Sequence, residues 1–302
     1  MSTNIKYLNE ISNQEKSAKC LIGYHNYILG IGDGMLVRIP KDRVIWARIR
    51  DSYPLLQIVK LRLGSIVPSY KLILADAGGK LPGFLFYRKI PGKSILDYSR
   101  REAPNELGMR TLGILAALHS IRLPRAYYKS HTIKSISKNQ MILYLQKYAR
   151  FKNTIKLLPA DMRQKSDLYW NKLINSIKCK HYVSIIHGDL DMRNILIDSK
   201  GKVSGVLDWD NIALGDPARD LCGLLEVYKY KQFNKIMAFY FNMMKIGSES
   251  SKRKLLDRIF FYGIMNRFYE LEFLSGGRNS KNLQILIKRL DEDLKLAANV
   301  KI

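Results

Sequence analysis

Short apolar runs separated by turn residues dominate the N-terminal part of the chain, a pattern typical of β-strands. Residues 18–40 predict two or three short strands, with a Gly-Asp-Gly turn between the last two. Residues 65–92 predict two more strands around a Gly-Gly turn. The stretch 42–63 has the mixed pattern of a helix, which Pro54 interrupts. We therefore expect a strand-rich unit of about 90 residues here.

After residue 105 the pattern of apolar positions changes to helical spacing. A connector near residues 88–97 separates this part from the strand-rich unit, and no internal repeat is present. The elements expected are a helix from 107 that ends before Pro124, amphipathic helices over 139–178, a strand at 181–186, a polar loop, a hairpin over 194–209, and helices to about residue 297.

The charge of the chain has two interpretations. Its 302 residues include 51 Lys and Arg against 26 Asp and Glu, a formal net charge of +25. Such an excess suits an anionic partner such as nucleic acid, a phosphate-rich ligand or a membrane surface. The basic residues are dispersed, without a block of five like charges, which favours a solvated basic surface instead. Nucleic acid is therefore not the expected partner, although the charge does not exclude it.

Cysteine content and hydropathy predict the compartment. The three cysteines are far apart and form no CxxC pair, so neither a disulfide framework nor a zinc site is indicated. The N-terminus lacks the apolar segment of a signal peptide, and no apolar run approaches the ~18 residues that span a bilayer. We expect a cytoplasmic protein with reduced thiols and no membrane association.

One region runs against the basic composition. Residues 181–226 contain eight acidic and four basic side chains. Carboxylate oxygens are the ligands that hard divalent cations prefer. The region is thus a better candidate for a metal site than for a phosphate backbone.

The loop at 187–194 reads H-G-D-L-D-M-R-N and fits the kinase template H-x-D-L-x-x-x-N. In that template the Asp faces the acceptor hydroxyl and the Asn holds a metal ion, positions that fall on Asp189 and Asn194. A second metal carboxylate must follow an intervening hairpin, and Asp208 stands there. The spacing predicts phosphoryl transfer, because Mg²⁺ must bridge the phosphates of a nucleotide while a separate carboxylate orients the acceptor.

Several segments together resemble the aminoglycoside phosphotransferase and choline kinase superfamily, a group of small-molecule kinases. They are IIHGDLDMRNILID, GVLDWDNIALGDPARDL, LGILAALHSI and FYRKIPG, and the resemblance runs from about residue 20 to 290. It implies an α+β, two-lobed, protein-kinase-like fold. Residues 1–90 would form the β-rich nucleotide-binding lobe, with a hinge at about 86–97. Residues 98–302 would form a mostly helical lobe with the catalytic loop, metal site and acceptor site.

The resemblance also implies a role for individual residues, with ATP or GTP as the phosphoryl donor. Asp189 would be the catalytic base, and Asn194 and Asp208 would bind Mg²⁺. Two residues would support the loop and four would meet the nucleotide. The supporting residues are His187 and Asp220; the nucleotide contacts are Arg38 at the phosphates and Phe86, Tyr87 and Arg88 at the base.

Two features depart from the family pattern. The N-terminal lobe has no clear Gly-rich phosphate loop, and no Glu lies between residues 15 and 101 to pair with Arg38 from a helix. Asp51 is the nearest acid in a plausible place. Four further acids are candidates for the acceptor or metal site: Asp191, Asp210, Glu270 and Glu272.

We therefore expect a monomeric small-molecule kinase that acts on a hydroxyl group. An aminoglycoside-type antibiotic is the favoured acceptor, while choline, thiamine, a macrolide or a sugar remain alternatives. A different class also remains open, namely a nucleotide-binding pseudokinase whose basic surface faces nucleic acid. The intact Asp189, Asn194 and Asp208 set disfavours that alternative, because a degenerate kinase is expected to lose one of them.

Overall fold

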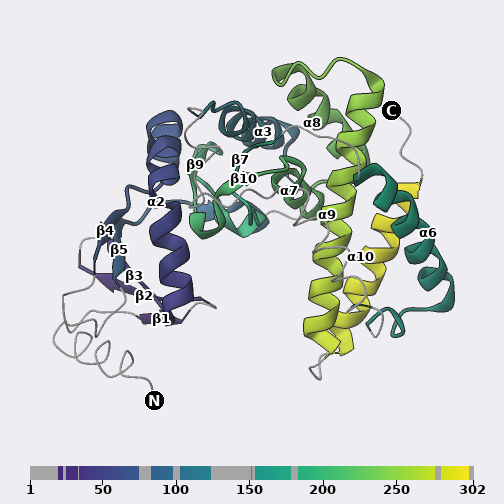
Figure 1. Ribbon diagram of the computed structural model, residues 1–302, viewed down its shortest axis with the longest axis horizontal. Helices are drawn as coiled ribbons and strands as arrows, with labels where there is room; N and C mark the ends of the chain where they lie inside the picture. The colour runs from purple at the N-terminus through teal and green to yellow at the C-terminus, as the bar shows by residue number, and fades with distance from the viewer. Residues whose placement is uncertain are drawn as a thin grey trace.

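The computed structural model describes residues 20–22, 25–32, 34–74, 83–97, 103–123, 151, 154–177, 183–275 and 280–298. Figure 1 shows a sheet and the helix α2 (Arg43–Leu63) at one end of the molecule. Long helices, among them α9 (Glu249–Ser275) and α10 (Ser280–Ala298), form the other end. Short strands lie between the two, and the whole is the α+β arrangement expected from the sequence.

The N-terminal sheet is antiparallel and has the strand order β1-β2-β3-β5-β4. The turn between β2 and β3 contains Gly32 and Gly34, whose φ angles of 30° and 75° suit glycine. The expected strands on both sides of α2 are thereby confirmed. The bounds are β1 Cys20–Ile22, β2 Asn26–Ile31, β3 Met35–Pro40, β4 Lys71–Ile73 and β5 Phe84–Arg88.

The interruption expected at Pro54 does not occur, because α2 continues through it for 21 residues. Asp42 caps the helix by accepting a hydrogen bond from the Ile45 amide at 2.8 Å. Buried residues at helical spacing, including Ile49 and Val59, give the helix one apolar face. Burial of that face outweighs the ~3 kcal/mol that an interior proline costs.

The C-terminal part combines helices with two small sheets. β7 pairs with β10, and the connector strand β6 pairs with β8, which pairs in turn with β9 in the expected hairpin. Of the helical region expected over 139–178, residues 139–150 lie outside the described residues. The strands are β6 Lys93–Ser94, β7 Ser184–Ile186, β8 Ile195–Ile197, β9 Val203–Val206 and β10 Ala213–Gly215; the α-helices are α3 Asn105–His119, α6 Ala160–Ile177, α7 Ala218–Leu221 and α8 Tyr230–Met243; the 3₁₀ helices are η1 Gly64–Ile66, η2 Ile95–Asp97, η3 Met192–Asn194, η4 Trp209–Asn211 and η5 Cys222–Glu226.

A continuous hydrophobic core extends from α2 into the helical part. It includes Val59 of α2, Tyr87 of β5, Leu112 of α3 and Phe260 of α9. This core fixes the sheet and α2 relative to the loops that follow β7 and β9. None of the helices in the described ranges is long and apolar enough to cross a membrane.

Candidate active site

Asp220 of α7 anchors the loop that follows β7. Its carboxylate is fully buried and accepts hydrogen bonds from the backbone amides of His187, at 2.7 Å, and Gly188, at 2.9 Å. His119 of α3 lies 3.1 Å away through Nε2. Burial acts to raise the pKa of Asp220, but His119 and these donors hold it below its usual range. An ionised Asp220 therefore fixes the backbone immediately before Asp189.

His187 is also fully buried and connects the loop to the end of β9. Its Nε2 lies 2.8 Å from the Leu207 carbonyl oxygen and must donate to it, since a carbonyl only accepts. The imidazole ring packs on Trp209 with a centroid separation of 4.6 Å. These contacts give His187 a supporting place rather than access to a reactant.

Asp189 is exposed, and a side chain of the neighbouring η4 contacts it. Asn211 of η4 donates its amide to Asp189 Oδ2 at 3.2 Å, and Arg48 of α2 donates to the Asn211 oxygen at 3.2 Å. Gly188 has a φ of 83°, and a Cβ there would lie 2.2 Å from the Asn211 carbonyl oxygen. Only glycine therefore allows the loop to pack this closely against η4.

The hairpin brings the two expected metal ligands together. The Leu207 amide donates to the Asn194 carbonyl at 2.8 Å, so Asn194 and Asp208 stand on adjacent strand ends. Asp208 has a left-handed backbone with φ 63° and ψ 57°, an uncommon conformation for a residue other than glycine. Burial acts to raise the pKa of Asp208, and Arg38 outweighs it, so the carboxyl stays ionised and able to bind a cation.

The chemistry of these two side chains fits Mg²⁺. Mg²⁺ takes oxygen ligands and usually one or two carboxylates, with phosphate oxygens and water completing its octahedron. Asp208 offers a carboxylate that is 45% exposed, and Asn194, half-buried on the adjacent strand end, has an amide oxygen of the kind that Mg²⁺ accepts as a ligand. Within the described ranges no three His, Cys, Asp or Glu side chains converge on a metal position.

Arg38 of β3 reaches across to the loop after β9. One of its terminal nitrogens, Nη2, lies 2.7 Å from Asp208 Oδ1 and 2.6 Å from Asp210 Oδ2. Asn26 donates to the same Asp210 oxygen at 3.2 Å. Asp51 does not join this group, since its carboxylate pairs with the adjacent Arg50 at 3.0 Å. The carboxylates that face Arg38 thus come from the turn after β9, at Asp208 and Asp210, and not from α2.

The three residues expected at the hinge form the end of β5. Phe86 is half-buried, Tyr87 is buried and Arg88 is exposed. The Tyr87 ring lies 4.8 Å from that of Tyr70 between centroids, which fixes the strand next to β4. Lys89 donates its amide to the Gly34 carbonyl at 2.8 Å, so the end of β5 lies beside the turn between β2 and β3.

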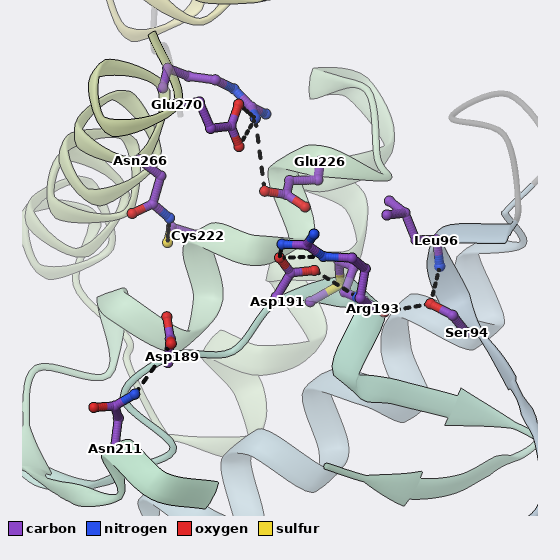
Figure 2. Close-up of polar contacts among 12 residues, drawn as sticks. Ser94, Leu96, Asp189, Asp191, Arg193, Asn211, Cys222, Glu226, Asn266 and Glu270 are labelled. Atoms are coloured by element: carbon purple, nitrogen blue, oxygen red, sulfur yellow. Dashed lines mark hydrogen bonds and ion pairs between the residues drawn. The ribbon is translucent and has the colours of Figure 1, made fainter. Parts of the chain in front are cut away.

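A cluster of charged residues lies on and beside the loop that follows β7 (Figure 2). Asp191 forms an ion pair with Arg193, and Arg267 of α9 bridges Glu270 at 3.3 Å and Glu226 at 3.8 Å. We refer to these five residues as the acidic cluster. Burial, with repulsion from Asp191 and Glu270, raises the pKa of Glu226 to about 7.

Glu272 belongs to a different face of α9 from Glu270, because residues two positions apart on a helix differ by about 200° in direction. The structure thus separates two acids that the sequence treats alike. It also adds residues that sequence reasoning missed, namely Asn26, Arg48, Asn211 and Glu226. The only local signal for one of them is that Asn211 directly follows the Asp-Trp-Asp segment.

Comparison with known proteins gives a consistent result. A family model described as "Phosphotransferase enzyme family" matches residues 21–237. Among curated proteins, the uncharacterized protein YcbJ of Bacillus subtilis is 37% identical over 59 residues, which are 20% of this chain and 19% of that protein. Viomycin phosphotransferase of Streptomyces vinaceus is 36% identical over 58 residues, 18% of this chain and 20% of that protein. These matches thus span about a fifth of each relative.

Solved structures resemble the chain over nearly its whole length. The GDP and kanamycin complex of APH(2")-IIIa superposes with a TM-score of 0.72 at 20% identity, covering 98% of this chain and 100% of that one. A macrolide 2'-phosphotransferase from Brachybacterium faecium gives a TM-score of 0.61 at 16% identity, covering 96% and 98%. At such identities the likeness shows the fold, which is the two-lobed kinase-like fold expected from the sequence.

Proposed function

The chain belongs to the phosphotransferase enzyme family, and from this premise we propose that it transfers the γ-phosphate of ATP or GTP to a hydroxyl group of a small, cationic, aminoglycoside-type acceptor. The transfer needs a carboxylate at the hydroxyl, ligands for a metal–nucleotide complex and a site for the acceptor. Each has a counterpart among the residues described above.

Asp189 is the proposed catalytic residue. It is the exposed carboxylate of the loop, and the neighbouring Asp220 is committed to backbone amides. Its position suits a group that orients the acceptor hydroxyl and receives its proton as the phosphate is transferred. Asn211 donates to Oδ2 of Asp189, so this hydrogen bond does not occupy the other carboxylate oxygen, Oδ1.

The nucleotide is proposed to lie between the sheet and the catalytic loop. The β5 end at Phe86, Tyr87 and Arg88 would meet the base, and Arg38 would meet the phosphates. Asn194 and Asp208 would hold Mg²⁺, which when bound bridges the phosphates and offsets their charge.

The acidic cluster carries the proposal for a cationic acceptor. Its three carboxylates, Asp191, Glu226 and Glu270, lie beside the guanidinium groups of Arg193 and Arg267 in a chain whose net charge is +25. Arg267 is also paired with Asp293 at 3.2 Å, so negative charge stays in excess even though Glu226, with a pKa of about 7, is partly protonated at neutral pH. Asp191 lies two residues after Asp189 on the same loop (Figure 2). A local excess of negative charge beside the reactive carboxylate favours an acceptor with amino groups.

The test is acceptor-dependent nucleotide consumption by the purified protein with Mg²⁺. ATP and GTP are supplied separately against aminoglycosides, macrolides, choline, thiamine and simple sugars. We expect turnover with aminoglycosides that disappears in Asp189→Asn and persists in Asp161→Asn, an exposed acid on α6. Turnover only with uncharged acceptors would refute the cationic acceptor, and nucleotide binding without turnover on any acceptor would favour a pseudokinase.

Glu270 and Glu272 provide a matched pair for the acceptor site. Glu270→Gln removes a carboxylate of the acidic cluster and should raise the KM for a cationic acceptor about tenfold, the effect of ~1.4 kcal/mol. Glu272→Gln removes an acid from another face of the same helix and should leave that KM within about twofold. Equal effects of the two variants would show that the cluster does not bind the acceptor.

A further inference from the structure

Arg38 is a buried cation that needs a fixed counter-charge. Its side chain is 8% exposed, and a guanidinium at that depth is stable only when paired and hydrogen-bonded. A kinase-like site usually gives the phosphate-contacting base a glutamate from the neighbouring helix. Here that helix is α2, and its 21 residues include a single acid, Asp51.

Asp51 cannot serve this purpose in the observed arrangement. Its carboxylate is 41% exposed and accepts two hydrogen bonds from Arg50, its neighbour in sequence. A side chain that α2 directs at the turn after β9 is instead Arg48, which donates to Asn211. The helix thus presents a base to the site where an acid would be expected.

Asp210 of η4 has the properties that the helix lacks. Its side chain is 10% exposed, accepts from Arg38 at 2.6 Å and accepts from Asn26 at 3.2 Å on the same oxygen. Asp208, two residues earlier, also contacts Arg38 but is 45% exposed. The exposed carboxylate of Asp208 remains accessible to a cation. The buried carboxylate of Asp210 is instead enclosed by its two donors from the sheet, Arg38 and Asn26.

Arg38 retains a donor for a further ligand. Its Nε is buried, and no acceptor for it is present among the described residues. A buried donor without a partner in a native structure calls for an explanation, and a phosphate oxygen would supply the missing acceptor. Both contacts of Arg38 to carboxylates use Nη2, so a phosphate at Nε would not compete for the same nitrogen.

We infer that Asp210, together with Asn26, is the positioning residue that holds Arg38 for the nucleotide phosphates, in place of a helix carboxylate. This assigns Asp210 neither to the acceptor nor to the metal. The turn from Asp208 to Asn211 would then serve three groups of the site. It carries the metal ligand Asp208, positions Arg38 through Asp210, and contacts the catalytic Asp189 through Asn211. The inference rests on the proposed function, because it requires that Arg38 contact a nucleotide.

The experiment measures binding of a fluorescent ATP analogue by the full chain, once in EDTA and once in saturating Mg²⁺. Asp210→Asn should weaken binding at least about tenfold in both conditions, since a misplaced Arg38 loses a charge-assisted contact with or without the metal. Asp51→Asn is the matched control and should change binding less than about twofold. Arg38→Met should weaken nucleotide binding to a similar extent as Asp210→Asn. The double variant should bind the nucleotide as tightly as the single variant with the lower affinity, because both changes disrupt the same contact.

Contrary outcomes are distinguishable. Weakening by Asp51→Asn instead of Asp210→Asn would overturn the inference, as would an Asp210→Asn effect that appears only with Mg²⁺, which would make Asp210 a metal ligand. Asp210→Glu keeps the charge and should restore most of the binding if the asparagine variant folds poorly. Failure of the wild type itself to bind the nucleotide would refute the proposed function rather than the placement of Asp210.

Discussion

Replacing Asp220 with asparagine exchanges one oxygen of a fully buried carboxylate for an amide group. The His187 amide binds Oδ2 of Asp220 and the Gly188 amide binds Oδ1, while His119 lies 3.1 Å from Oδ2. Asparagine has one acceptor oxygen, so at least one backbone N–H must face an NH₂ group. An unmet buried donor costs about 1–3 kcal/mol, and the loss of charge at the remaining bonds adds about 1 kcal/mol, for a total of about 3 kcal/mol.

This cost is large against a typical domain stability of about 5–15 kcal/mol. Urea unfolding followed by circular dichroism measures it directly, and with a slope of about 3 kcal/mol per molar the midpoint should fall by about 1 M. Asp161→Asn, which removes an exposed acid that pairs with Lys165 on α6, should shift the midpoint by less than about 0.2 M. If Asp220→Asn shifts the midpoint as little as the Asp161→Asn control does, the reasoning that Asp220 anchors the catalytic loop is refuted.

Two further predictions concern the same region. Burial and neighbouring carboxylates raise the pKa of Glu226 to about 7. The folded state therefore retains a proton that the unfolded state releases from about pH 4.5 upward. The free energy of unfolding should fall by up to about 3 kcal/mol as pH rises from about 4.5 to 7. Glu226→Gln should remove this part of the slope in urea midpoints measured at pH 5 and pH 7.5, and an unchanged slope would contradict the assignment. Gly188→Ala should abolish activity and lower the stability by about 3 kcal/mol or more, because the added Cβ would meet the Asn211 carbonyl. Gly201 is the matched control, since it has a φ of 71° but no atom within 4 Å of an added Cβ. Gly201→Ala should lower the stability by about 1 kcal/mol and retain activity. Thermal unfolding and turnover of the two alanine variants measure this difference, and equal losses would show that contact with Asn211 is unimportant.

The parts of the molecule that the sequence predicts well are those with local causes. The strands, the hairpin and the spacing from His187 to Asn194 depend on residues close together in the chain, and the structure confirms that the hairpin brings residue 194 next to residue 208. Pro54 misled the prediction of α2, because burial of an apolar face is a tertiary effect that local propensity does not contain.

The charge pairs were harder to predict because they join distant positions. Arg38 and Asp210 are 172 residues apart, and the sequence offers Asp51 as the nearer acid. Glu226 becomes recognisable only once η5 and α9 bring it beside Arg267. Which acids share a site thus depends on packing of helices, while which acids follow a hairpin or a loop motif can be read from the chain.

The basic composition and the acidic cluster have different consequences. A net charge of +25 slows long-range capture of a cation, while in the proposed function the acidic cluster beside Asp189 favours a cationic acceptor once it has arrived. The rate of acceptor binding should therefore rise with added salt at low ionic strength, because salt screens distant charges more than partly buried ones.

The central claim is that Asp189 directs phosphate from a nucleotide to a hydroxyl of the acceptor. The most direct measurement is mass spectrometry of an aminoglycoside after incubation with the protein, Mg²⁺ and ATP or GTP. The account predicts a singly phosphorylated acceptor with the wild type and with Asp161→Asn, and none with Asp189→Asn. A phosphorylated product formed equally well by Asp189→Asn would contradict the account.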